Sequence, residues 1–223
     1  MLSEGYTAIQ NRPGLLIETH MLKDYKTRVD ATYYMLMLTM DILNKEYQTL
    51  TKINIEADHM VADPSFRKDS LHLDFKPSDD STMVIFKGID YEVDTSDLTG
   101  GLWYKYGNEK KDFHLPFFND LKAVVTVQLP DAYIVPPEWT ELIYKLDLHG
   151  IKYQKLESDT TITVSSYKFE NVKFSHEPYE GCQTVRDFDM KEITEKRFYP
   201  AGSVHIDMNQ RTARVIAHIL EPD

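Results

Sequence analysis

A glutamate that follows a short apolar run is the residue whose type and position best suit chemistry. Glu18 comes directly after Leu15-Leu16-Ile17, and Pro13-Gly14 precedes that run. A short apolar run bounded by turn residues is typical of a fully buried strand. Ligand sites in α/β proteins collect at the carboxyl ends of such strands, where loss of water makes a carboxylate a stronger base. The pattern predicts a general base at Glu18; the alternative is a structural carboxylate paired with Arg12, Lys23 or Arg28.

The histidines and the cysteine add few candidates. His20 could contact a substrate or orient Glu18, and the alternative is a histidine that forms structural hydrogen bonds. Only His218 has a glutamate three residues later, Glu221, and the two residues after it leave no room for a further ligand downstream. We therefore expect no metal site in this chain. Cys182 is the single cysteine, so no disulfide within the chain is expected.

The elements that must position Glu18 are a strand before it and a helix after it. Apolar side chains recur at helical spacing between Asp24 and Tyr47, at Val29, Tyr33, Leu36, Met40 and Leu43. Asp24 or Thr27 can cap the start of this helix. Neighbouring methionines and leucines widen its apolar surface beyond one stripe. We therefore expect a helix of five or six turns that is covered on more than one side.

The rest of the chain carries mainly β signals. Residues 48–80 contain several turn clusters and are predicted to be a linker or an excursion between two regions. Pro137 is expected to open a second helix that ends before Gly150. Alternating residues at 204–208 and 213–219 predict a closing hairpin. Strands are expected at the segments rich in β-branched and aromatic residues, namely 82–86, 89–93, 102–106, 123–127, 151–153 and 160–164.

Composition narrows the function classes. The chain has 223 residues and a formal net charge of −11, with its acidic residues scattered along it. Nucleic acid is an improbable partner, because binding phosphates requires a basic surface. No apolar window is long enough to cross a membrane, and the first residues do not resemble a signal peptide. The localisation of the intact protein stays open, with secretion or an extracytoplasmic place compatible with the sequence.

At Glu18 the sequence resembles a known family. The segment from Tyr6 to Lys23, which continues to Tyr25, Arg28 and Val29, is similar to zinc carboxypeptidases of the M14 type, particularly bacterial members of the carboxypeptidase A-like group. Weaker similarity recurs further along the chain, at Pro130–Tyr133, His149–Ile151, Tyr167, Pro200–Ser203 and Leu220–Pro222.

The resemblance implies a function and a site. In that family the corresponding glutamate is the general base and acid beside the zinc-bound water, a role that falls on Glu18. A tyrosine also lies near the catalytic glutamate in the family, which makes Tyr6 a candidate for binding substrate, together with His20. The intact enzyme would bind zinc and a peptide substrate, whereas this chain alone is expected to bind no zinc and to need an upstream catalytic-domain segment.

The resemblance also implies an architecture. Residues 1–47 would be the end of an M14-like catalytic domain, an α/β remnant of one strand and a long helix. Residues 48–80 would be a linker, and residues 81–223 a β-rich α+β accessory domain. The alternative is a non-catalytic module that binds a peptide or a glycan. Trp103, Tyr104 and Tyr106 are the candidates for contacting that ligand, although such aromatic residues more commonly pack against residues of a neighbouring strand.

Overall fold

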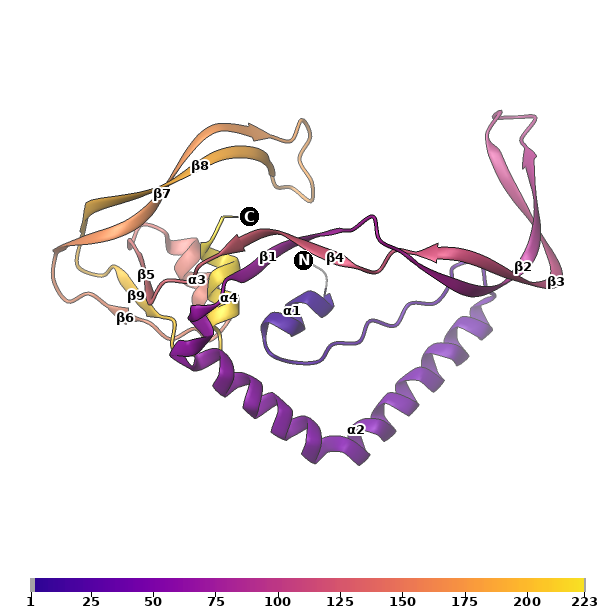
Figure 1. Cartoon of the computed structure of the whole chain (residues 1–223), viewed down its shortest axis with the longest axis horizontal. Helices are drawn as coiled ribbons and strands as arrows, with labels where there is room; N and C mark the ends of the chain where they lie inside the picture. The colour runs from indigo at the N-terminus through magenta and orange to yellow at the C-terminus, as the bar shows by residue number, and fades with distance from the viewer. Residues whose placement is uncertain (1–2, 223) are drawn as a thin grey trace. The chain divides into compact units, whose positions relative to one another are not determined.

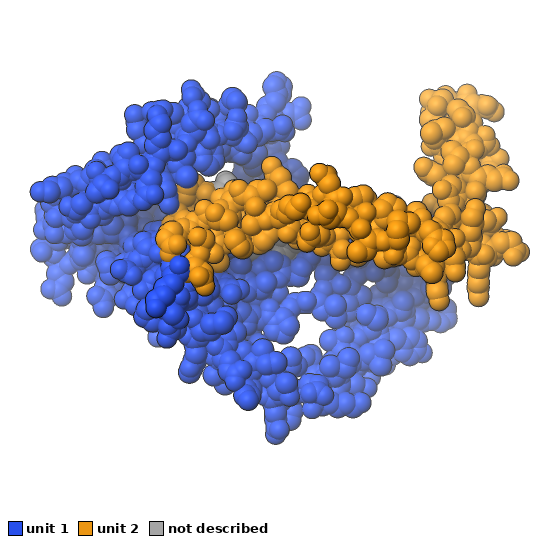
Figure 2. Space-filling view, viewed as in Figure 1, with its two compact units in different colours: residues 1–68, 129–220 blue, residues 69–128, 221–223 orange. Residues whose placement is uncertain are grey.

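The computed structural model describes residues 3–222, which fall into two compact units. Unit 1 combines the residues up to 68 with residues 129–220, and unit 2 consists of residues 69–128 and the residues from 221 on (Figure 2). Every strand pair in the described range is antiparallel. Residues 1, 2 and 223 of the predicted domain ranges lie outside the described residues.

Unit 1 holds all the helices found in the described residues, together with a small sheet. Its strands form a three-stranded sheet in the order β5-β9-β6 and a separate β7-β8 ribbon (Figure 1). Its elements are α1 (Ser3–Ile9), α2 (Tyr25–Ala62), the 3-10 helix η1 (Pro64–Lys68), β5 (Ala132–Val135), α3 (Thr140–Leu148), β6 (Gln154–Lys155), β7 (Thr160–Phe174), β8 (Val185–Tyr199), β9 (Val204–Asp207) and α4 (Ala213–Leu220).

The core of unit 1 lies around β9 and α4. Alternate residues of the β9 region, Val204, Ile206 and Met208, are buried, and α4 buries Ala213, Val215, Ile216 and Ala217. From α2, only Val61 near its end belongs to this core. The buried apolar residues are Val61, Leu129, Val135, Leu146, Ile151, Tyr199, Val204, Ile206, Met208, Ala213, Val215, Ile216 and Ala217. Most of α2 is therefore outside the core.

Unit 2 consists of two ribbons joined end to end. Strand β1 (Leu71–Pro77) pairs with β4 (Leu121–Val127), and β2 (Thr82–Thr95) pairs with β3 (Leu102–Phe117). The backbone N–H of Ser78 donates to the carbonyl of Asp120 at 2.9 Å, where the two pairs meet. A two-stranded ribbon is at best marginally stable in water without further packing. Unit 2 thus leaves most of its apolar side chains exposed.

The surface of the chain is large for its mass. The accessible area is 17104 Å² for 26.0 kDa. A folded globular monomer of this mass exposes about 10,500 Å² by the usual scaling with mass, and two separate globular units of these sizes would expose roughly 12,500 Å². Folding of this chain by itself therefore buries much less surface than folding of an ordinary domain.

The predicted buried strand before Glu18 is wrong. Residues 12–20 have no regular secondary structure, and Leu15 and Leu16 are 62% and 49% exposed. A buried strand needs neighbouring strands to accept and donate its backbone hydrogen bonds, and no described strand pairs with this segment. The predicted start of the helix that follows is confirmed. Asp24 is its N-cap, and the Asp24 carboxylate accepts a hydrogen bond from the Thr27 N–H at 2.9 Å.

The predicted linker over residues 48–80 is also wrong. α2 continues unbroken to Ala62, and η1 and β1 follow it. No proline or glycine occurs within Tyr25–Ala62, and the helix ends at Asp63-Pro64. The assignment of residues 1–47 to a carboxypeptidase catalytic domain is a prediction that these elements leave open.

The prediction of a closing hairpin is correct for its first strand only. Residues 204–207 form β9, but the segment predicted to be its second strand is the helix α4. Ala213, Ile216, Ala217 and Leu220 share a helical face, and a short apolar run fits both periods. The second helix is present as α3 and Gly150 follows its end at a φ of 65°, but the helix begins at Thr140 and not at Pro137.

The remaining strand predictions are confirmed with longer bounds, except one. The two segments at 82–86 and 89–93 belong to a single strand, β2, and the segments at 102–106, 123–127 and 160–164 lie in β3, β4 and β7. Residues 151–153 are not a strand; the pairing there is limited to β6, Gln154–Lys155.

Candidate functional site

Glu18 lies in an extended, solvent-exposed segment that links α1 to α2. We call residues Arg12–Asp24 the strap. Glu18 and His20 are both exposed, and no described residue forms a hydrogen bond or ion pair with the Glu18 side chain. His20 Nδ1 accepts a hydrogen bond from the Leu22 N–H at 3.1 Å, in a turn that precedes α2. Glu18, the candidate base, is therefore exposed to water in this chain.

Tyr6 is not brought to Glu18. Its hydroxyl lies 3.0 Å from Nδ1 of His149, which caps the C-terminal end of α3, and the two rings are 5.6 Å apart. Gln10 Nε2 also donates to this hydroxyl at 3.1 Å. Tyr6 and His149 thus fasten α1 to α3, and the described contacts give Tyr6 a structural place.

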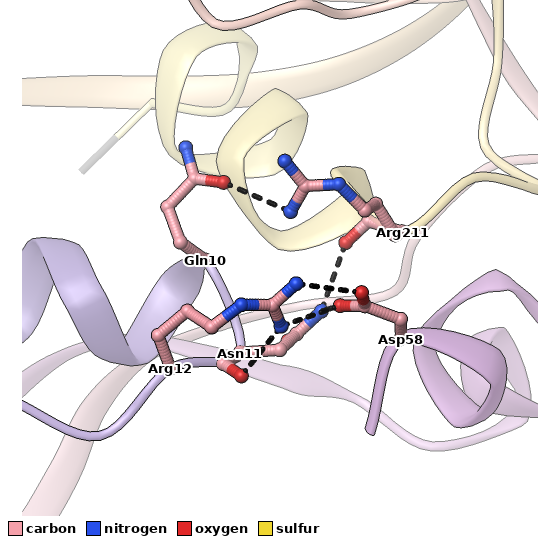
Figure 3. A network of polar contacts seen from close by, with 5 residues as sticks. All are labelled: Gln10, Asn11, Arg12, Asp58 and Arg211. Carbon is pink, nitrogen blue, oxygen red and sulfur yellow. Dashed lines mark hydrogen bonds and ion pairs between the residues drawn. The ribbon is translucent and has the colours of Figure 1, made fainter. Parts of the chain in front are cut away.

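Arg12 has a partner other than Glu18. Its guanidinium forms a two-pronged ion pair with Asp58 of α2, with Nη2 to Oδ2 at 2.7 Å and Nη1 to Oδ1 at 2.9 Å (Figure 3). Such paired hydrogen bonds fix both the distance and the orientation of the two groups. The suggested pairing of Glu18 with Arg12 is therefore wrong.

Asn11 completes this network. The Asn11 amide donates to Asp58 Oδ1 at 3.1 Å and to the backbone carbonyl of Arg211 at 3.0 Å, just before α4 (Figure 3). Asn11 is 9% exposed and has a φ of 59°, in the left-handed region. Arg211 donates in turn to Oε1 of Gln10 at 3.3 Å. The network joins the start of the strap to α2 and to the segment that leads into α4.

Charge pairing shifts the ionisation of both partners. The hydrogen bond from Arg12, opposed by desolvation and reinforced by Asn11, lowers the pKa of Asp58 from its ordinary value. The same hydrogen bond raises the pKa of Arg12. Both groups are therefore charged at neutral pH. Spacing did not reveal this pair, since 46 residues separate its members.

Thr19 of the strap and the first turns of α2 line a hollow of about 420 Å³. The Arg28 guanidinium lies over the Tyr25 ring at 5.9 Å from its centre. The lining residues are Thr19, Tyr25, Arg28, Val29, Thr32, Tyr33 and Leu36. Aromatic, cationic and aliphatic groups thus share this hollow with Thr19, the residue that follows the candidate base in the chain.

The middle of α2 carries apolar side chains on every side. Over residues 33–43 only Thr39 and Asp41 are not apolar, and three turns of helix point side chains in all directions. We call these residues the apolar belt. A helix that is apolar all round is normally buried within a larger body. Here the belt residues are 43% to 64% exposed: Tyr33, Tyr34, Met35, Leu36, Met37, Leu38, Met40, Ile42 and Leu43.

The aromatic residues of β3 gather with others at one part of the β2-β3 ribbon. Tyr91 lies 5.5 Å from Tyr104, 6.5 Å from Tyr106 and 5.9 Å from Phe113, measured between ring centres. The three tyrosines stay about half exposed. Trp103 pairs with Asp94 and is covered by Lys105 at 5.0 Å. The cross-strand packing predicted for Tyr104 and Tyr106 is present, and their outer surfaces remain open.

Across residues 3–222, no three histidine, cysteine, aspartate or glutamate side chains come together as a metal site would require. No helix in the described part is both long and apolar enough to cross a membrane.

Comparison with known proteins relates this chain to carboxypeptidases over about half its length. It is 32% identical over 102 residues to carboxypeptidase 2 of Trichophyton tonsurans, which covers 46% of this chain and 19% of that protein. It is 31% identical over 114 residues to carboxypeptidase 2 of Trichophyton rubrum, covering 50% and 21%. The chain thus spans about a fifth of these relatives. It matches no family model and no solved structure.

Proposed function

We propose that this chain is part of a zinc carboxypeptidase of the M14 type, in which Glu18 is the general base and acid. The observation that carries the proposal is the similarity to two proteins named carboxypeptidase 2. The segment around Glu18 supports the finer assignment, because its resemblance to the M14 group is the most specific in the sequence. The resemblance to bacterial members rests on the sequence alone, and the relatives found are fungal.

Glu18 would supply the proton transfers of peptide hydrolysis. Its carboxylate would take a proton from the attacking water and later deliver it to the leaving amine, which joins the two steps through one group. A carboxylate works best in this role when solvent is excluded around it. Glu18 is exposed in this chain, so a further polypeptide segment would have to cover the strap.

The described residues do not fit a zinc ion by themselves. No three metal-ligating side chains come together in residues 3–222, and a catalytic zinc normally has three protein ligands. In the proposed enzyme the zinc ligands would belong to residues outside this chain. We therefore assign no step of the reaction to zinc here.

The apolar belt supports the need for a covering segment. Its residues are distributed all round the helix, so a partner on one side would leave the remainder in water. Burying side chains of this size stabilises a protein by about 1.5–3 kcal/mol each. We propose that the belt packs inside the upstream part of the catalytic domain.

A hybrid enzyme tests the proposed function. In it this chain takes the place of the segment that it matches in carboxypeptidase 2 of Trichophyton rubrum. We expect release of the C-terminal residue from a peptide and loss of this activity when a chelator removes zinc. A hybrid that is folded and zinc-loaded, but does not release the C-terminal residue, would contradict the proposal.

The aromatic cluster favours a second function, binding of a peptide or glycan by the β2-β3 ribbon. Its half-exposed tyrosine rings offer flat apolar surface and hydroxyl groups to a ligand. Such a module would not depend on Glu18. Substitution of Tyr104 by alanine would then weaken binding, whereas Glu18→Gln would leave it unchanged.

A further inference from the structure

Both ends of the strap are fastened to the same helix. At one end, Asp24 is the N-cap of α2 and its carboxylate accepts from Thr27. At the other end, Arg12 is paired with Asp58, four residues before α2 ends at Ala62. Because the strap continues directly into α2, the two form a loop that is closed by the Arg12–Asp58 ion pair and by the hydrogen bond from Asn11 to Asp58.

The lengths of the two paths restrict this loop. The strap spans 12 residues from Arg12 to Asp24, and even a fully extended chain of that length reaches only roughly 40–43 Å. The helix spans 34 residues from Asp24 to Asp58, which is about 51 Å if it is straight. The two side chains of the ion pair would have to span the remaining roughly 8–11 Å, which requires both to be extended. A straight helix would thus leave the strap almost no slack.

α2 is bent, which relieves this constraint. Figure 1 shows the helix changing direction near its middle, with the strap running across from α1 to its start. The Thr39 hydroxyl donates to the Met35 carbonyl at 2.8 Å, a contact that bends helices. The bend and the Arg12–Asp58 pair therefore belong together, because each makes the other easier to form.

The fastening at Arg12 is also firm locally. Asn11 is buried with two hydrogen bonds, and the ring of Pro13 restricts its own backbone and that of Arg12. Gly14 lies so close to α1 that an added Cβ would come within 2.1 Å of Thr7 Oγ1. These local restraints fix the direction in which the strap extends from the Arg12–Asp58 pair.

We infer that the Arg12–Asp58 pair is a positioning device that fixes the place of Glu18. Glu18 is the midpoint of the strap, six residues from each fastening. Loss of the Arg12–Asp58 pair would let the first part of the strap move away from α2 and take Glu18 with it. The catalytic value of this device rests on the proposed function, but the device itself does not.

Distances between spin labels on the full chain test the inference. Cys182→Ser removes the single cysteine, and cysteines at Leu16 in the strap and Lys45 in α2 carry the labels. We expect one narrow distance distribution in the parent. Asp58→Asn, which keeps the size of the side chain but not its charge, and Arg12→Ala should each broaden it at least twofold. Asp58→Glu, which keeps the carboxylate, should retain a narrow distribution.

Two controls complete the experiment. Asp30→Ala breaks the exposed Lys26–Asp30 pair on α2 and should leave the distribution unchanged. Arg12→Ala combined with Asp58→Asn should be no broader than either single variant, because both remove the same fastening. A distribution as narrow in Asp58→Asn as in the parent would overturn the inference, as would a broad one in the parent. None of these distance measurements depends on catalysis. Failure of this inference can therefore be told apart from failure of the proposed function.

Discussion

Asn11 combines a left-handed backbone with two side-chain hydrogen bonds, and two substitutions separate these contributions. Asn11→Gly tolerates the φ of 59° but leaves the Arg211 carbonyl without the amide, which should cost about 1–3 kcal/mol. Asn11→Ala should cost about 1 kcal/mol more, because a Cβ disfavours the left-handed region. Urea unfolding followed by circular dichroism measures both. Equal losses would mean that the backbone conformation relaxes.

The ion pair at Asp58 predicts a pH dependence with a definite sign. Because its pKa is lowered in the folded chain, the pair contributes its full stability above the ordinary aspartate value of about 3.9. This contribution is lost as the pH falls through the lowered folded pKa. The parent should therefore lose more unfolding free energy on acidification than Asp58→Asn. Denaturant unfolding between neutral and strongly acidic pH measures this, and parallel curves would contradict the prediction.

Elements whose ends are marked by caps and breakers could be predicted from sequence. Asp24 marks the start of α2, and Gly150 follows the end of α3. The sequence does not predict the full length of α2, because the polar residues after Tyr47 resemble a linker although no proline or glycine occurs between them and Asp63-Pro64. The sequence does not distinguish helix from strand at residues 213–219, because a short apolar run fits both.

Gly150 provides a prediction at the scale of an element. Its φ of 65° suits glycine, and an added Cβ would meet no atom within 4 Å. Gly150→Ala should therefore destabilise the end of α3 by about 1 kcal/mol through backbone strain alone. Gly150→Asn should cost less, since asparagine tolerates this region better. The free energy of unfolding in urea measures both, and a larger loss for asparagine would point to another cause.

The candidate site could be predicted only in part, because its residues depend on contacts distant in sequence. Glu18 was found from an apolar run, yet the strand expected before it has no partner among the described residues. The pairing of Arg12 with Asp58 and the contact of Tyr6 with His149 join residues 46 and 143 positions apart. No spacing rule covers such pairs, whereas local caps and turns follow from neighbouring residues.

At the scale of the whole molecule, exposed apolar surface and the span of the relatives both favour a larger functional body. The chain matches about a fifth of each carboxypeptidase 2, and the apolar belt is uncovered. The isolated chain should therefore bind no stoichiometric zinc and release no C-terminal residue from peptides. Metal analysis of the purified protein and a peptide assay measure this. Stoichiometric zinc together with cleavage would show that the chain is active by itself.

The most direct test of the account is the turnover of the hybrid enzyme with and without the Glu18 carboxylate. Glu18→Gln should reduce the release of C-terminal residues by about 10²–10⁴-fold, because one positioned acid and base is lost. Zinc content should stay unchanged, and Glu46→Gln on the exposed surface of α2 should leave turnover near the parent value. Turnover in Glu18→Gln close to that of the parent would contradict the account.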